Sequence, residues 1–222
     1  MSDPNPTQPS LLPLILGSRN LKKCAEMAAL IAPPWERRPW MDLVAIDSLK
    51  SHPDCPEVVE DAETFAGNAR KKASETALAL GRWVLADDSG LSVDALKGAP
   101  GVHSARYAGE PSDDEANNRK LLEALADVPD DRRGAEFRCV LALADPEGKI
   151  RLEAEGVCRG RIIHEPRGPG GFGYDPLFLI PEYHKTFGEL SPLVKHQLSH
   201  RSRAFARLRP GLERLVLELA RG

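Results

Sequence analysis

The sequence has 222 residues, of which 41% are hydrophobic and 28% are charged, and its formal net charge at pH 7 is −3. This composition is typical of a globular protein and excludes a strong overall attraction to nucleic acid or to an anionic membrane. No apolar run approaches the roughly 18 residues of a membrane-spanning helix. The four cysteines are scattered without a CxxC pair, and no signal-peptide pattern opens the chain, so we expect free thiols and a cytoplasmic location.

The N-terminal part of the chain predicts an extension followed by a strand, a helix and a second strand. Residues 1–13 hold four prolines, which is typical of a disordered extension. A short apolar run at 14–16 predicts the first strand, and residues 43–46 predict the second. Between them, residues 20–32 repeat apolar side chains at helical spacing and end at two prolines, which predicts a helix.

Small and polar residues, Gly17 to Asn20, join the first strand to the first helix, which begins with Lys22 and Lys23. A strand, a small-residue loop and a helix N-terminus often form a phosphate site, because free backbone N–H groups point outward there. The loop is not a P-loop, since the GxxxxGK(S/T) motif is absent. The alternative interpretation is that the two lysines belong to an ordinary solvated helix face.

Residues 64–80 predict an alanine-rich helix that ends at Gly81. One face of this helix consists of Phe65, Asn68, Ala69, Lys72, Thr76 and Ala79. Asn68 and Lys72 therefore lie beside Phe65 rather than opposite it. Either this face lies at the margin of the core and Lys72 reaches water, or it lines a cleft and Lys72 meets an anion.

Residues 83–87 predict a buried strand that ends in two neighbouring acids, Asp87 and Asp88. Because successive side chains of a strand point to opposite faces, the two carboxylates are expected to have different roles. One would bind a metal or activate water while the other anchors the turn, although Asp-Ser-Gly is also a common turn sequence. Glu60 would bring a further carboxylate, and a few oxygen ligands together with phosphate usually hold Mg²⁺.

The second half of the chain mixes strand and helix patterns. Short or alternating apolar runs predict four strands, at 91–93, 136–144, 150–163 and 177–180. Residues 145–148 predict a hairpin turn, and residues 113–125 predict a helix. A C-terminal helical region is expected from Ser191-Pro192 to about residue 220, with a kink near Pro210. This mixture predicts an α/β fold with at least one antiparallel hairpin.

Two polar segments near the C-terminal end predict ligand contacts. The loop 168–176, GPGGFGYDP, places two aromatic residues and an acid among glycines, which permits close approach and stacking of a flat base. His200 and Arg201, with Lys195 nearby, provide hydrogen-bond donors for a carbonyl oxygen or a phosphate. The alternatives are an ordinary aromatic-anchored loop and a basic surface helix.

Seven stretches, in this order, resemble the noncanonical purine nucleoside triphosphate pyrophosphatases, the inosine/xanthosine triphosphate pyrophosphatase (Ham1-like) family. They are GSRNLKK (17–23), EDAETFAGNARKKA (60–73), LADDSGLSVDALKGAPGVHSARYAG (85–109), FRCVLALAD (137–145), GGFGYDPLF (170–178), KTFGELSP (185–192) and KHQLSHRSRA (195–204). The resemblance covers residues 14–209. Departures from the family pattern, such as Arg19 in the phosphate loop, leave the base preference open.

The resemblance implies an enzyme that hydrolyses ITP, dITP and XTP to the monophosphate and pyrophosphate with Mg²⁺. It implies an elongated, two-lobed α/β fold with a central mixed sheet flanked by helices and an active site in the cleft between the lobes. Residues 14–222 would form this single domain. The protein is expected to act as a homodimer on a nucleotide substrate, without nucleic acid or a membrane as partner.

The resemblance also implies roles for individual residues. The residues assigned to the triphosphate are Ser18, Asn20, Lys23 and Lys72, those assigned to the nucleoside loop are Phe172, Gly173, Tyr174 and Asp175, and those assigned to base recognition and phosphate are Lys195, His200 and Arg201. Ser89 contacts substrate, Glu60 and Asp88 hold Mg²⁺, and Lys72 contacts phosphate during catalysis. Asp88, or Asp87, positions the attacking water; Asp87 is otherwise a second metal contact or a brace for the turn.

Basicity is expected to contribute little, because an aspartate with its ordinary pKa of about 3.9 is a weak base. Donors such as His200 and Arg201 would satisfy a 6-carbonyl group but not the 6-amino group of adenine. Two alternatives stay open, a pyrophosphatase for modified pyrimidine triphosphates and a non-catalytic nucleotide sensor. An RNA-binding module built on the arginines at 201–214 is disfavoured, since that segment has the pattern of an amphipathic core helix.

Overall fold

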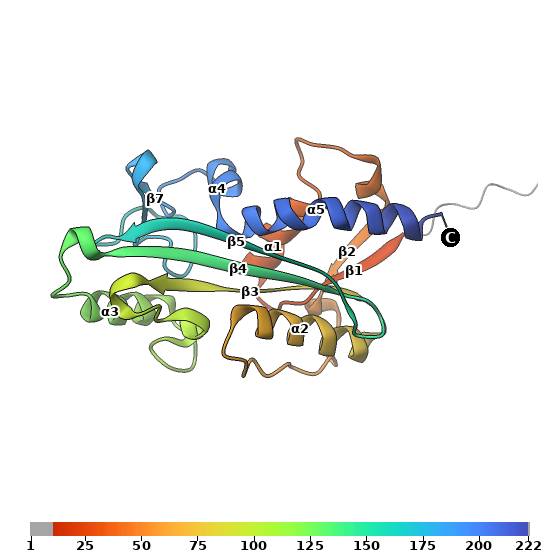
Figure 1. Ribbon diagram of the computed structural model, residues 1–222, viewed down its shortest axis with the longest axis horizontal. Coiled ribbons are helices and arrows are strands. Elements are labelled where there is room, and N and C mark those ends of the chain that lie inside the picture. The colour runs from red at the N-terminus through yellow and green to blue at the C-terminus, as the bar shows by residue number, and fades with distance from the viewer. Residues whose placement is uncertain (1–10, 222) are drawn as a thin grey trace, which may run out of the picture.

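Seven strands form one mixed sheet in the computed structural model, which describes residues 11–221 (Figure 1). Strand β1 (Leu12–Leu16) pairs in parallel with β2 (Val44–Ser48) and with the start of β3 (Trp83–Val93). The strands that follow β3 pair antiparallel and are β4 (Gly134–Ala144), β5 (Ile150–Ile162), β6 (Phe178–Ile180) and β7 (Lys185–Thr186). The predicted α/β class with an antiparallel hairpin is therefore confirmed.

Strands β3, β4 and β5 run along most of the length of the molecule (Figure 1). Strand β1 pairs only with Trp83–Leu85 at the start of β3, whereas β6 pairs with Arg161 and Ile162 at the end of β5. The antiparallel registers place these two pairings at opposite ends of the long strands. Strand β3 consequently continues beyond the last residue that it pairs with β1.

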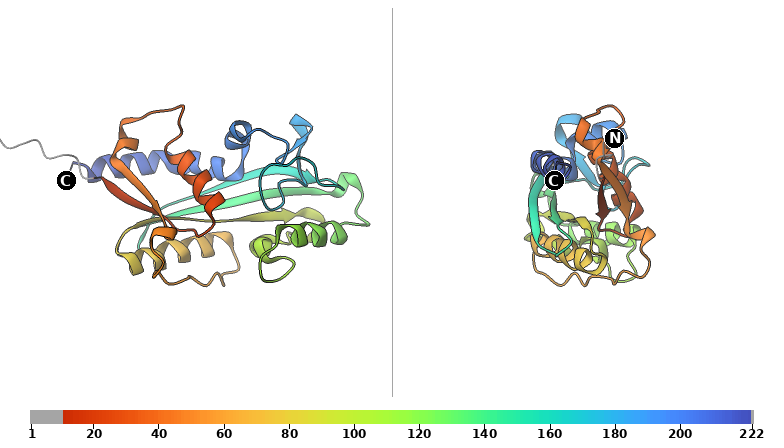
Figure 2. Two further views of the ribbon diagram at one scale, coloured as in Figure 1. Left: turned by 180° about the vertical axis from the view of Figure 1, so that it is seen from behind. Right: turned by 90° about the vertical axis from the view of Figure 1, so that its right-hand side faces the viewer.

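The helices are divided between the two faces of this sheet (Figures 1 and 2). They are α1 (Leu21–Ile31), α2 (Phe65–Leu80), α3 (Asp114–Ala124), α4 (Pro192–Leu198) and α5 (His200–Leu219). Helices α2 and α3 lie on one side of the sheet, and α4 and α5 lie on the other together with α1. None of the described helices is both long and apolar enough to cross a membrane.

The pleat of β3 distributes its side chains between two cores. Val84 and Ala86 pack in the core on the α2 side, whereas Leu85 packs in the core that α1 and α5 cover. The face that α2 turns to the sheet carries fully buried alanines, including Ala69 and Ala73, so its backbone comes close to the strands. The same alternation continues into the polar residues that follow Ala86.

Short polar side chains fix the helix ends that the sequence predicts. The Asn20 carboxamide oxygen accepts the backbone N–H of Lys23 at 3.2 Å, and the Thr64 hydroxyl accepts that of Gly67 at 3.0 Å. Gly81 ends α2 in the left-handed region with φ 59°. The helices expected at 20–32 and 64–80 are therefore confirmed to within one residue at each end.

The strands expected at 83–87 and 91–93 are one continuous strand, which corrects the prediction. The residues between them keep extended pairing with β4, where Asp87 lies opposite Leu141 and Asp88 opposite Val140. Asp-Ser-Gly favours a turn when taken alone, but here continuous antiparallel pairing with β4 keeps the segment extended. The two acids consequently lie in the middle of a strand and not at its end.

The boundaries at both ends of the chain also differ from the predictions. Leu12 and Pro13, expected in the disordered extension, belong to β1, and residues 1–10 of that extension lie outside the described residues. The C-terminal helical region is divided at Ser199, which caps α5, and α5 runs through Pro210. Ala79, expected on the buried face of α2, is exposed. Strand β7 was not predicted, because its two residues carry no alternating pattern.

Helix α5 contacts β5 directly at Gly156. A β-carbon added at Gly156 would lie 2.2 Å from the carbonyl oxygen of His200 and 2.2 Å from the backbone nitrogen of Ala204. Any side chain at this position would push away the N-terminal turns of α5, which carry Arg201. The absence of a side chain on β5 is therefore what positions this end of the helix.

We predict that Gly156→Ala lowers the free energy of unfolding by about 1–3 kcal/mol through overpacking. The matched control is Gly134→Ala in β4, where the added carbon meets the ends of the exposed Asp94 and Arg159 side chains and no backbone atom. Urea denaturation of both variants measures the difference. Equal stability of Gly156→Ala and Gly134→Ala would contradict this account of the contact between α5 and β5.

Candidate active site

The two consecutive acids of β3 face opposite sides of the sheet, as strand alternation predicts. Asp88 lies on the α2 side, where its Oδ1 is 3.4 Å from the Lys72 amine. Asp87 lies on the α1 and α5 side, where its Oδ2 is 3.5 Å from the Lys23 amine and 3.3 Å from the Arg201 guanidinium. Both carboxylates are buried, with 1% of Asp87 and 5% of Asp88 exposed. Each acid therefore has its own set of cations from different helices.

Asp87 is held as a carboxylate anion. Burial alone would raise the pKa of Asp87, but the positive charges of Lys23, Arg201 and Lys72 outweigh burial and hold this pKa well below its usual value. The Ser89 hydroxyl donates a further hydrogen bond to Asp87 Oδ2 at 3.0 Å. An acid with this environment takes up no proton near neutral pH, and it fixes the cations that surround it.

Asp88 has the opposite electrostatic environment. Burial raises the pKa of Asp88 to about 6, and the charge of Glu60 adds to this increase while Lys72 opposes it. The Lys72 amine lies 3.0 Å from Glu60 Oε2 as well as 3.4 Å from Asp88, and its side chain is only 12% exposed. Although burial favours the neutral amine, the three nearby carboxylates raise the pKa of Lys72. The structure thus contradicts the interpretation in which Lys72 reaches into water.

The residues on the α2 side fit a divalent cation. Asp88 Oδ2 is buried and has no hydrogen-bond partner within residues 11–221, and the Glu60 carboxylate shares Lys72 with Asp88. One amine does not balance two carboxylates, as the raised pKa of Asp88 also indicates. Across the described residues, no group of three or more His, Cys, Asp or Glu side chains forms a complete metal site. The arrangement matches Mg²⁺ sites in which one or two carboxylates act together with substrate phosphates.

The predicted phosphate loop is less open than expected. The backbone N–H groups of Gly17 and Ser18 donate to carbonyl oxygens, and the N–H of Asn20 donates to the Ser18 hydroxyl at 3.2 Å. The Asn20 side-chain oxygen in turn accepts the N–H groups that begin α1. These N–H groups are therefore already satisfied, so the backbone cradle is smaller than expected. Among the described residues, the N–H groups of Arg19 and Leu21 are left for an anion, together with side chains such as the Lys23 amine.

A cavity of about 110 Å³ brings most of the predicted substrate-binding residues together. Those that line it are Asn20, Lys23, Ser89, Phe172, Gly173, Tyr174, Asp175, Lys195, His200 and Arg201. Ser18 and Lys72 do not line this cavity, and Lys72 lies with Glu60 and Asp88 on the α2 side of β3. The free edge of β3 beyond its pairing with β1 separates these two groups. Most of the predicted site residues therefore lie in two adjoining groups.

The loop of Phe172 to Asp175 has one half-buried ring and one buried ring. Tyr174 is 4% exposed, and its hydroxyl donates to the Ser104 carbonyl oxygen at 2.8 Å. Asp175 Oδ2 accepts the Phe172 backbone N–H and the Lys195 amine, each at 2.8 Å. The ring of Phe172 lies 4.9 Å from the same amine and is only half-buried. Phe172 is therefore the ring available for stacking, and Tyr174 anchors the loop.

His200 enters the cavity wall as a neutral imidazole. Its ring stacks on Phe137 with centroids 4.8 Å apart, and burial lowers the pKa of His200 well below its usual value, with Arg201 and Lys195 adding to this effect. His200 Nδ1 is buried without a hydrogen-bond partner among the described residues. The side chain therefore offers one unused hydrogen-bonding nitrogen and no charge.

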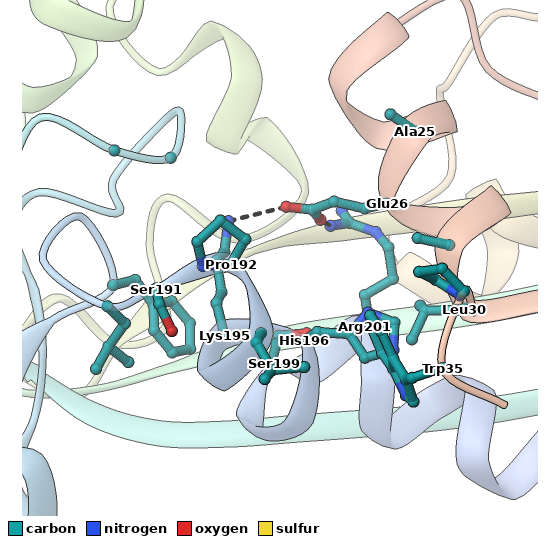
Figure 3. Close-up of a pocket in the computed structure, with 17 residues that line it drawn as sticks. Ala25, Glu26, Leu30, Trp35, Ser191, Pro192, Lys195, His196, Ser199 and Arg201 are labelled. Atoms are coloured by element: carbon teal, nitrogen blue, oxygen red, sulfur yellow. Dashed lines mark hydrogen bonds and ion pairs between the residues drawn. The ribbon is translucent and has the colours of Figure 1, made fainter.

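Glu26 of α1 is a charged contact that sequence reasoning missed. Its carboxylate accepts from the Lys195 amine at 2.9 Å and from the Arg201 guanidinium (Figure 3). These three residues also line a second pocket of about 720 Å³, whose walls include Trp35 and Leu30. The available signal was an acid one helical turn after Lys23 on the predicted helix.

The sequence matches the model of the Ham1 family over residues 14–211. It is 58% identical over 203 residues to a dITP/XTP pyrophosphatase of Rhodopirellula baltica, with 91% of this chain and 94% of that protein covered. The Staphylococcus aureus Ham1 protein structure has 36% identity and a TM-score of 0.78, covering 91% of this chain and 99% of that chain. A structure from Mycobacterium abscessus, described as a nucleoside-triphosphatase and dITP/XTP pyrophosphatase, has 42% identity and a TM-score of 0.70, covering 90% and 100%.

We predict that His200 makes the folded protein sensitive to mild acid. Because the folded-state pKa of His200 is lowered, its stability contribution is complete above the unfolded pKa of about 6.5 and is lost as the pH falls below that value. Between pH 7.5 and 5.5 the wild type should lose about 1.4 kcal/mol more stability than His200→Gln. Urea denaturation at both pH values measures this. His103→Gln, at an exposed position, is the control and should keep the wild-type pH dependence.

Proposed function

This chain belongs to the Ham1 family, and on that premise we propose that it hydrolyses dITP, ITP and XTP to the monophosphate and pyrophosphate. It is a nucleoside triphosphate pyrophosphatase, which confirms the family and the enzyme class predicted from the sequence. The observation that carries the assignment to this site is the meeting of Lys23, Lys72 and the acids of β3 beside a cavity with a half-buried aromatic ring. In this proposal the lysines bind the polyphosphate, the acids position the attacking water, and the aromatic ring stacks on the nucleobase.

We place the active site between the two ends of the sheet. Strands β1 and β2 lie at one end of the long strands and β6 and β7 at the other, and we regard these ends as the two lobes of a single domain. The cavity borders on α1 from the first end and on the loop of Phe172 from the second. A substrate bound there would contact both lobes with its triphosphate at the N-terminus of α1 and its base at the loop.

Glu60 and Asp88 are the residues that would hold Mg²⁺ in this proposal. The support is the unpartnered Asp88 Oδ2 and the two carboxylates that share the single Lys72 amine. When bound, the ion supplies neutralisation of phosphate charge. Lys23 and Lys72 bind phosphate oxygens in the same region, so charge develops on the leaving pyrophosphate next to fixed cations.

Asp88 acts as the base for the attacking water. A base is most effective when its pKa lies near the working pH, and the pKa of Asp88 is raised to about 6. This raised pKa applies to the site without a bound ion and supports a stronger base than an ordinary aspartate, whereas a bound cation would lower the pKa of Asp88 again. The water oxygen forms a bond to the α-phosphorus, its proton passes to Asp88, and the bridging oxygen leaves with pyrophosphate. Asp87 keeps its negative charge and fixes Lys23 and Arg201.

Base selection rests on the far side of the cavity. A 6-carbonyl group accepts hydrogen bonds, and the cavity wall there contains the donors Lys195 and Arg201, of which Arg201 keeps its buried Nε unpaired among the described residues. Adenine would present amino hydrogens to the same donors and leave them without acceptors. Phe172 supplies the face on which the purine stacks.

We further propose a homodimer that works in the cytoplasm. The four cysteines are all buried and unpaired, as is usual for proteins of a reducing compartment. The dimer rests on the family resemblance, and light scattering of the purified protein in dilute solution is the direct measurement. A monomeric mass would contradict it.

Pyrophosphate release with Mg²⁺ should be fast from dITP, ITP and XTP and slow from GTP, ATP and dUTP. The need for a purine with a 6-carbonyl acceptor accounts for the slow turnover of ATP and dUTP. Guanine also has a 6-carbonyl group, so slow turnover of GTP requires a second contact that rejects its 2-amino group. A coupled pyrophosphate assay measures all six substrates under one condition. Equal turnover of ATP and ITP would contradict the account of base selection, and preferred turnover of dUTP would favour a pyrimidine enzyme.

Substitution of the two acids should separate their roles. Asp88→Asn should lower kcat by about 10²- to 10⁴-fold, because the base is lost, while ITP binding is retained. Asp87→Asn should lower the free energy of unfolding by about 3–5 kcal/mol, because the buried Arg201 would lose one of its two carboxylate partners and keep only Glu26. Steady-state kinetics and urea denaturation of both variants provide the measurements. Full activity of Asp88→Asn would refute its role as the base.

A further inference from the structure

Helix α3 holds the backbone of Gly173 at both of its polar groups. The Asp114 carboxylate accepts the Gly173 N–H at 2.8 Å, and the Asn118 side-chain amide donates to the Gly173 carbonyl oxygen at 3.0 Å. Asp114 and Asn118 are four residues apart on α3 and therefore share one face of the helix. Two side chains of one helix thus form hydrogen bonds with a single residue of the loop that borders the cavity.

The Asn118 side chain has a second feature that supports a role for its hydrogen bond to Gly173. Its side-chain oxygen is buried and has no hydrogen-bond partner within the described part of the chain. A buried unpaired oxygen costs stability, and such positions in native proteins usually have another reason to persist. The hydrogen bond from the Asn118 amide to Gly173 is the contact that orients this side chain.

The two hydrogen bonds to Gly173 matter because the glycines give the loop backbone wide conformational freedom. Gly171 and Gly173 flank Phe172, and both have positive φ values, 80° and 60°, which glycine adopts without strain. The Phe172 N–H is already held by Asp175. Adding the two contacts from α3 fixes the backbone on both sides of Phe172, and only its side chain is left to face the cavity.

The position of the Phe172 ring connects three separate elements. The Lys195 amine of α4 lies 4.9 Å from the ring centroid, and the Lys22 amine of α1 lies 5.8 Å from it. The loop itself is attached to α3 through Gly173. A shift of the loop on α3 would therefore move the stacking ring relative to the cations of the other two helices.

We propose that Asp114 and Asn118 are positioning residues for the nucleoside, which act through Gly173 to hold Phe172 as a stacking platform. The inference rests on the proposed function of the cavity and goes beyond it, since neither residue is among the groups expected to bind substrate. Asp114 borders the cavity, whereas Asn118 does not line it. Neither residue contacts Asp88, so the effect falls on substrate binding and not on the chemical step.

The first test measures KM and kcat for ITP in Asp114→Ala and Asn118→Ala. Loss of one such hydrogen bond should raise KM by about 2- to 10-fold, with kcat within about 2-fold of the wild type. Asp114→Asn should restore the wild-type KM, because its amide oxygen also accepts the Gly173 N–H. An unchanged KM in both alanine variants would overturn the proposal.

Glu115→Ala is the matched control on the same helix turn. Glu115 is also an acid in the first turn of α3, but its side chain is 90% exposed and, among residues 11–221, pairs only with Arg119. Both alanine substitutions remove a negative charge that favours the helix N-terminus, so any general weakening of α3 affects them alike. A rise in KM for Glu115→Ala equal to that for Asp114→Ala would overturn the proposal.

A double-mutant cycle with Phe172→Ala tests the route of the effect. If Asp114 acts through the ring, Asp114→Ala should raise KM no further once Phe172→Ala is present. Independent, multiplicative effects of the two substitutions on KM would overturn the proposal. A purely structural role of Asp114 also predicts multiplicative effects, so the cycle distinguishes the two.

Direct binding of ITP, measured by calorimetry without Mg²⁺, separates this inference from the proposed function. If the wild type binds ITP but releases no pyrophosphate, the proposed function fails while the cycle can still be carried out on dissociation constants. If the wild type turns ITP over and the α3 variants bind it as tightly as the wild type, the proposed function stands and the positioning role of α3 fails.

Discussion

The pleat of β3 is the constraint on which the site depends. Two consecutive residues of a strand point to opposite faces, and here both are acids in the buried middle of the sheet. An unpaired buried carboxylate is costly, so each face has to supply cations. Lys72 of α2 meets one acid, and Lys23 of α1 with Arg201 of α5 meets the other. The placement of three helices is thus tied to one pair of neighbouring residues.

The two faces of β3 compensate their acids to different degrees. This difference assigns a structural role to Asp87 and leaves Asp88 for the proposed chemistry. The positive charges of Lys23, Arg201 and Lys72 outweigh the effect of burial on Asp87. They lower its pKa and keep it ionised. Asp88 shares one amine with Glu60, and burial raises its pKa instead. The surplus of negative charge on that face is the basis of the two proposed roles, binding of a divalent cation and acceptance of a proton from water. A balanced ion pair there would be more stable, and it would have no capacity left for metal or proton.

Local rules predicted the parts of this site that depend on neighbouring residues. Alternation predicted opposite directions for Asp87 and Asp88, and the helical spacing of apolar residues from Asn20 onward predicted the start of α1 to within one residue. Contacts between distant segments were outside the reach of such rules. Glu26 meets Lys195 across 169 residues of sequence, and the raised pKa of Asp88 depends on a carboxylate from a separate coil segment. The satisfied N–H groups of the phosphate loop were missed because their acceptors are set by the fold of the loop itself.

The long strands explain why recognition and chemistry are mechanically separate. Asp88 lies in β3 and is fixed by a register of ten paired residues with β4, so its position does not depend on the glycine loop. The loop of Phe172 is attached at the far end, where α3 and β6 hold it. In the proposed binding mode, changes in that loop or in α3 would alter the position of the bound nucleobase and leave the position of Asp88 unchanged. In the proposed mechanism, preference for the nucleobase can therefore change without rebuilding the reaction centre, because the two are carried by different elements around the same sheet.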